Sequence, residues 1–68
     1  MKLFVETPAD FRDIATDAVV IPRVGEQVLC SPMPTYTDRS HTQPVAMTVS
    51  NVKYDYTADA VYVTVDKA

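Results

Sequence analysis

The 68-residue chain has one cysteine, one glycine, one histidine and no tryptophan. A single cysteine excludes an internal disulfide and a four-cysteine zinc cluster. A single glycine argues against a glycine-rich phosphate loop, so we expect no nucleotide site. The chain has no apolar run of about 18 residues, which excludes a transmembrane helix, and residues 1–6 turn polar too early for a secretory signal. We therefore predict a cytoplasmic protein.

The charge balance is mildly acidic, with nine Asp and Glu against six Lys and Arg and a net charge of −3. Binding to phosphate groups requires clustered basic residues, whereas the six here are scattered along the chain. They are Lys2, Arg12, Arg23, Arg39, Lys53 and Lys67. We therefore expect neither a nucleic acid nor a membrane as partner.

The apolar residues present favour strands. Valine occurs 11 times and threonine 8 times, against two leucines and two isoleucines. β-Branched residues fit a pleated, half-buried surface, so the composition predicts an all-β fold. The length allows a single small domain over residues 1–68, and a domain this short needs a tight core or self-association to be stable.

Alternating apolar residues predict strands at residues 2–6, 26–30, 45–54 and 60–66, beside a short apolar run at residues 18–21. The alternation in residues 45–54 changes phase at Ser50 and Asn51, which predicts a β-bulge there. Gly25 follows the turn begun by Pro22, and we expect it to need a backbone conformation that other residues disfavour.

The segment Thr7-Pro8-Ala9-Asp10 carries a helix-start signal. Phe11 and Ile14 follow at helical spacing, so we predict one or two helical turns over residues 8–15; an ordered loop is the alternative. The helix would lay these two side chains over an open end of the sheet.

Together these elements predict an all-β fold, a small five-stranded bent antiparallel sheet or Src-homology-3-like barrel with one short N-terminal helical turn. A curved open sheet capped by the helix is the alternative. Residues 31–43 have no periodicity and predict a long loop, of a kind that is usually functional or mobile.

The segment Ile21-Pro22-Arg23-Val24-Gly25-Glu26-Gln27-Val28 resembles a turn in small bacterial and phage β-barrel proteins. In those proteins a Pro-Arg-x-Gly-Glu-x-Val turn leads into the first long strand of the barrel. The resemblance covers about 40 residues, including the later strands at residues 45–65. It implies a fold and a phage or mobile-element origin, and it implies no activity. The long proline-containing loop departs from the short hairpin typical of these proteins.

Candidate chemistry is sparse. Cys30 and His41 could form a nucleophile and base, and Asp38 could join them around a metal, but neither arrangement has the spacing of a known site. Cys30 is better interpreted as a small buried hydrophobe and His41 as a solvated loop residue. We therefore predict no enzyme, no catalytic residues, no cofactor and no metal.

Tyrosine, methionine and arginine are common in protein interfaces and suggest protein contacts here. Tyr54 and Tyr56 are in phase near the last hairpin, with Tyr62 across from them on the next strand, although cross-strand tyrosines can also simply stabilise a hairpin. The loop adds further candidates. The predicted interaction residues are Met33, Tyr36, Arg39, Tyr54, Tyr56 and Tyr62.

The sequence thus predicts a non-enzymatic protein-interaction module that binds another protein or itself. A structural subunit of a homo-oligomeric assembly is one alternative. A small inhibitor of a host protein is another.

Overall fold

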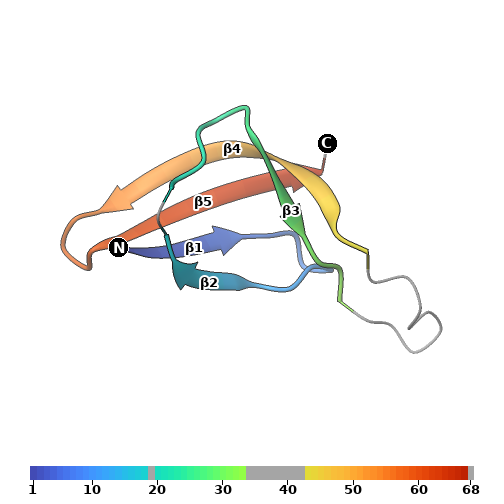
Figure 1. Cartoon of the computed structure of the whole chain (residues 1–68), viewed down its shortest axis with the longest axis horizontal. Helices are drawn as coiled ribbons and strands as arrows, with labels where there is room; N and C mark the ends of the chain where they lie inside the picture. The colour runs from blue at the N-terminus through green and yellow to red at the C-terminus, as the bar shows by residue number, and fades with distance from the viewer. Residues whose placement is uncertain (19, 34–42, 68) are drawn as a thin grey trace.

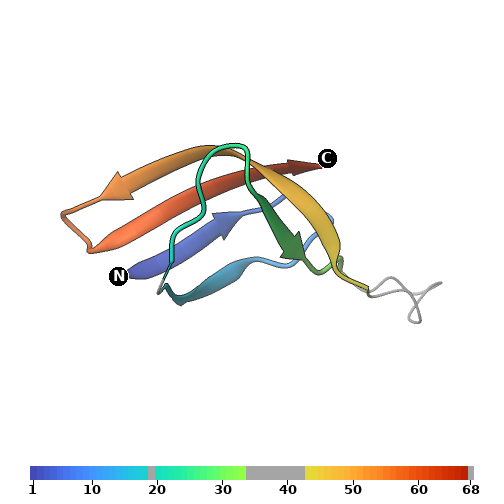
Figure 2. The same cartoon turned by 45° about the horizontal axis from the view of Figure 1, so that its top comes forward.

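The computed structural model describes residues 1–18, 20–33 and 43–67, which form five strands (Figure 1). The strands are β1 (Lys2–Glu6), β2 (Ile14–Asp17), β3 (Gln27–Cys30), β4 (Val45–Asp55) and β5 (Ala60–Lys67). They form one sheet in the order β2-β1-β5-β4-β3. The sheet curls into a half-barrel, as the two views in Figures 1 and 2 show. The predicted all-β, five-stranded bent sheet is confirmed.

One strand pair departs from the predicted antiparallel arrangement. β1 pairs with β5 in parallel, with Phe4 opposite Tyr62, whereas the other three neighbouring pairs are antiparallel. Local alternation shows which residues face the core, but it carries no information about which distant strands become neighbours. The pairing of β1 with β5 places the N-terminal strand inside the sheet, between β2 and the central strand β5.

The core lies on the concave face of the sheet. Val61, Val63 and Val65 alternate along β5 and are at most 2% exposed, as the sequence predicted. Side chains from other parts of the chain complete this buried cluster. They are Leu3, Val5, Phe11, Cys30, Met47 and Val49. Because successive side chains of a strand point to opposite faces, the other side of the sheet is free to carry polar groups.

The predicted bulge and the predicted glycine conformation are both confirmed, and they lie side by side. The register of β4 against β5 shifts between Val49 and Asn51. Gly25 has a φ of +93°. Its N–H donates to the carbonyl oxygen of Val49 at 2.9 Å, and the N–H of Val49 donates to the carbonyl oxygen of Glu26 at 2.8 Å. The turn before β3 is therefore anchored to β4 where β4 bends.

The predicted helical turn at residues 8–15 is wrong. The N–H of Phe11 donates to the carbonyl oxygen of Pro8 at 3.0 Å, which closes a single turn, and Ile14 already belongs to β2. The N–H of Arg12 donates to the carbonyl oxygen of Ser31 at 3.0 Å, and an isolated bridge joins Phe11 to Pro32. So short a helix has little stability of its own, and pairing with distant backbone replaces it. Phe11 still enters the core, at 7% exposure.

Candidate interaction surface

The distal half of β4 has a free backbone edge. β3 pairs with β4 only up to Thr48, and Gly25 and Glu26 extend this contact to Val49. Beyond that point, no other strand within the described ranges pairs with this side of β4. In Figure 1 this part of β4, drawn in orange, runs with β5 away from β3. We call residues 50–55 of β4 the open edge.

The backbone groups along the open edge follow from the register. The N–H and C=O groups of Val49 point toward β3, because they bond Glu26 and Gly25. Residues on one face of a strand direct their backbone groups to the same side. Val52 and Tyr54 share the face of Val49, because they lie opposite Val63 and Val61. Val52 and Tyr54 therefore direct their N–H and C=O groups away from the sheet.

The turn after the open edge is held by a carboxylate. Oδ1 of Asp55 accepts the N–H of Thr57 at 3.0 Å, the N–H of Ala58 at 3.2 Å and the Thr57 hydroxyl. The hydroxyl hydrogen bond is the main reason that the pKa of Asp55 lies below its ordinary value. Asp59 completes the turn with a φ of +50°, a conformation that Asp tolerates better than most residues. These contacts fix how the hairpin presents its side chains.

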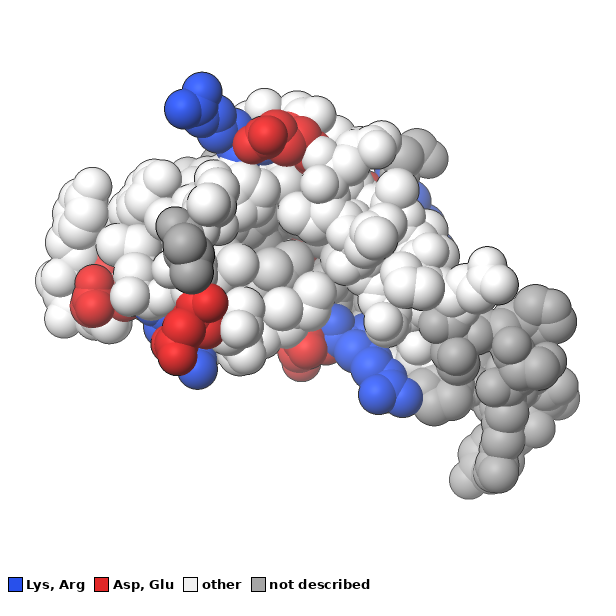
Figure 3. Space-filling view, in the orientation of Figure 1, with Lys and Arg blue, Asp and Glu red and all other residues white. Residues whose placement is uncertain are grey.

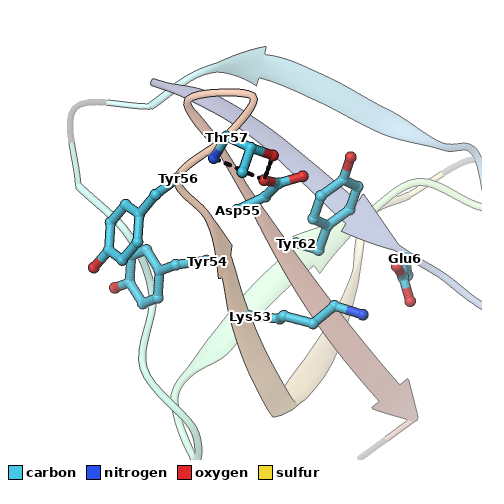
Figure 4. Close-up of a pocket in the computed structure, with 7 residues that line it drawn as sticks. All are labelled: Glu6, Lys53, Tyr54, Asp55, Tyr56, Thr57 and Tyr62. Carbon is cyan, nitrogen blue, oxygen red and sulfur yellow. Dashed lines mark hydrogen bonds between the residues drawn. The ribbon is translucent and has the colours of Figure 1, made fainter.

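Tyr54 and Tyr56 form an exposed aromatic pair on the concave side of the hairpin. Their rings stack with centroids 6.0 Å apart and planes 19° apart. Tyr54 is 47% exposed and Tyr56 is 82% exposed. Figure 4 shows both rings on one side of the hairpin, next to the open edge. The pair therefore exposes two neighbouring aromatic rings, each with a large apolar area and a polar hydroxyl, beside the open edge.

Tyr62 lies on the other face of the sheet. It is opposite Lys53 on β4, not Tyr54, because the turn makes Val61 the partner of Tyr54. Its ring stacks on Phe4 of β1 with centroids 5.2 Å apart, and it is only half-buried. The sequence-based placement of Tyr62 across from Tyr54 is therefore wrong, and Tyr62 serves mainly to join β5 to β1.

An open pocket of about 500 Å³ surrounds the end of the hairpin (Figure 4). The residues that line it combine tyrosines with charged groups. They are Glu6, Lys53, Tyr54, Asp55, Tyr56, Thr57 and Tyr62. The lining of this pocket therefore combines aromatic side chains with charged side chains from β1 and β4.

The charged side chains do not gather into a patch of one sign on the face that Figure 3 shows. There, Lys and Arg lie apart from one another, with wide uncharged areas between them over the described atoms.

Cys30 is fully buried and belongs to the core, as predicted. Burial raises the pKa of its thiol, which disfavours the thiolate that nucleophilic catalysis requires. His41 and Asp38 lie outside the described residues. Among the residues that the structure describes, no three His, Cys, Asp or Glu side chains form a group able to hold a metal ion. The same described part of the chain contains no helix long and apolar enough to cross a membrane.

The predicted loop contacts divide into two sets. Met33 is described and is 51% exposed. Its N–H donates to the carbonyl oxygen of Asp10 at 2.8 Å, which ties the start of the loop to the turn before Phe11. Tyr36 and Arg39 lie outside the described residues. The hairpin therefore carries Tyr54, Tyr56 and Tyr62, whereas Met33 lies elsewhere on the molecule.

Sequence reasoning missed the open edge. A signal was present, because the strand predicted at residues 26–30 is much shorter than the strand predicted at residues 45–54. A short strand cannot cover a long neighbour along its whole length.

Comparison with known proteins gives no assignment. No protein-family model matches the chain, and no curated protein or solved structure is significantly similar to it. The function therefore has to be argued from the surface itself.

Proposed function

We propose that the chain is a non-enzymatic protein-interaction module that contacts its partner through the end of the β4–β5 hairpin. The observation that carries this proposal is the open edge of β4 next to the exposed, stacked pair Tyr54 and Tyr56. An unpaired edge offers backbone hydrogen bonds to an added strand, and flanking side chains supply specificity.

The composition of the open edge supports this use. Natural proteins often protect exposed edges with proline, short strands, bulges or charges, especially lysine. The bulge of β4 lies at the start of the open edge, between Val49 and Asn51, and residues 52–55 beyond it pair regularly with β5. Residues 50–55 contain no proline, and their only charged residues are Lys53 and Asp55, which carry opposite charges. Tyrosine is among the residue types that most often dominate binding energy at interfaces. The edge therefore combines available backbone groups with aromatic anchors.

Site-specific photocrosslinking tests the proposal. A photoreactive phenylalanine analogue is introduced at Tyr56, in cells that express the chain. The matched control is the same analogue at Leu29 of β3, which is 67% exposed and lies away from the hairpin. We expect a covalent adduct with a protein from position 56 and none from position 29.

The outcome can also decide between the hairpin and the loop. The analogue at Met33 tests the loop contact predicted from the sequence. Adducts from position 33 without adducts from position 56 would contradict the hairpin proposal and favour the loop. The mass of an adduct shows whether the partner is a second copy of the chain or a different protein.

A further inference from the structure

The open edge of β4 is complementary to itself, which identifies a partner. Two copies that pair antiparallel through the same strand are related by a two-fold axis. If residue i of the first copy lies opposite residue j of the second, then residue j of the first lies opposite residue i of the second. Because Val52 and Tyr54 direct their backbone groups outward, only a few registers pair these groups with each other.

Three registers are possible, and the structure disfavours two of them. With Val52 opposite itself, Asp55 would lie opposite Val49, whose outward groups already bond Gly25 and Glu26. With Lys53 opposite itself, two positive charges would face each other, which destabilises a strand pair.

The third register places Tyr54 opposite itself and Lys53 opposite the partner's Asp55. Two oppositely charged pairs then form on one face, and two Tyr54 rings meet on the other, flanked by Tyr56. Oδ1 of Asp55 accepts all the hydrogen bonds that this carboxylate makes with described residues, which leaves Oδ2 for the lysine. Lys53 forms no ion pair within the described part of the chain.

We infer that a second copy of this chain pairs with the open edge in the antiparallel register that places Tyr54 opposite Tyr54. This inference rests on the proposed function, for which it names the partner. The two half-barrels then share one continuous sheet through β4. The contact involves about five residues from each copy, so it belongs to the small, weak class of interfaces and forms reversibly at high protein concentration.

The first test is light scattering coupled to size-exclusion chromatography, from low micromolar to near-millimolar protein. We expect the mass of the unmodified chain to rise from monomer toward dimer, and added salt to weaken the dimer because charge pairs contribute to it. The variant Lys53→Glu places two acids opposite each other and should raise the dissociation constant several-fold above that of Lys53→Gln. A monomer at every concentration would overturn the inference.

The register is tested by disulfide formation under mild oxidation. In Tyr54→Cys the two new cysteines lie directly opposite, about 5.5 Å apart between Cα atoms, within the range for a disulfide. In the matched variant Lys53→Cys they lie diagonally, about 7–8 Å apart, beyond that range. Cys30 is buried and does not take part.

We expect covalent dimer from Tyr54→Cys at a rate many-fold above that from Lys53→Cys. Faster crosslinking of Lys53→Cys would overturn the register. Circular dichroism of both variants excludes unfolding as the cause, and the salt and Lys53→Glu measurements do not depend on the cysteines. If the chain stays monomeric while photocrosslinking at Tyr56 captures a different protein, self-pairing fails and the proposed function stands.

Discussion

Replacing Gly25 tests how the turn before β3 is held against β4. The φ of +93° lies where residues with a Cβ are strained, and a Cβ added to Gly25 would meet no atom within 4 Å. The effect of alanine is therefore purely conformational. A left-handed backbone conformation destabilises the folded state by about 1–2 kcal/mol for an L-residue. Alanine also lowers the conformational entropy of the unfolded chain, which stabilises the folded state by about 0.4–1 kcal/mol. We expect Gly25→Ala to lower the free energy of unfolding by roughly 1 kcal/mol.

The mirror-image residue provides the matched control. In a chemically synthesised chain with D-alanine at position 25, the unfolded state has the same reduced conformational entropy as with L-alanine. A positive φ, however, is favourable for a D-residue. We expect it to be more stable than the wild type by about 0.4–1 kcal/mol.

Urea denaturation followed by circular dichroism measures all three chains. The L- and D-alanine chains should differ by about 1–2 kcal/mol, a large fraction of the roughly 3–10 kcal/mol expected for a domain of this size. Equal stabilities for the two chains would refute the assignment of the cost to backbone conformation.

Two further predictions concern the core and the hairpin turn. Met47→Ala removes a fully buried side chain and should cost about 2–5 kcal/mol in urea denaturation, against about 0.5 kcal/mol or less for exposed Leu29→Ala; similar losses would contradict the core assignment. The pKa of Asp55 is lowered in the folded state, mainly by the hydrogen bond from the Thr57 hydroxyl. The ionised carboxylate therefore stabilises the fold at pH values above the ordinary aspartate pKa, and this stabilisation is lost as the pH falls through the lowered pKa of the folded state. Thermal unfolding should therefore show Asp55→Asn less stable than the wild type at neutral pH, with the difference shrinking in acid; a difference independent of pH would contradict this role.

The strands were predictable because their signals are local and repeated. Alternating valines identified β5, and the change of phase at Ser50 and Asn51 located the bulge in β4. The single glycine at position 25 identified a positive φ, because no other residue type adopts it so readily. Each of these features depends on neighbouring residues alone.

The helix prediction failed where local and distant interactions compete. Thr7 and Pro8 carry a helix-start signal, but one or two turns gain few hydrogen bonds for the conformational entropy they lose. Pairing of Arg12 with Ser31, and of β2 with β1, satisfies the same backbone groups with partners from elsewhere in the chain. The sequence does not show where those partners lie.

The candidate site was predicted in part. Tyrosines were selected by residue type, and Tyr54 and Tyr56 do form an exposed pair next to an unpaired edge. Tyr62 does not lie opposite Tyr54 as predicted, because the cross-strand partner depends on the length of the turn and on the register. The unequal lengths of the strands predicted at residues 26–30 and 45–54 were visible in the sequence. That these two strands are neighbours, which leaves part of β4 unpaired, emerges only from the assembled sheet.

Amide hydrogen exchange of Val52 and Tyr54 tests most directly whether the backbone of the open edge is free and whether a second copy pairs with it. The amides of both residues point away from the sheet, so in dilute protein they should exchange quickly with solvent deuterium. In concentrated protein, pairing with a second copy should slow these two amides selectively, while the amides of β5 stay protected throughout. Fast exchange of both amides at every concentration would contradict self-pairing, and slow exchange already in the dilute monomer would contradict the open edge itself.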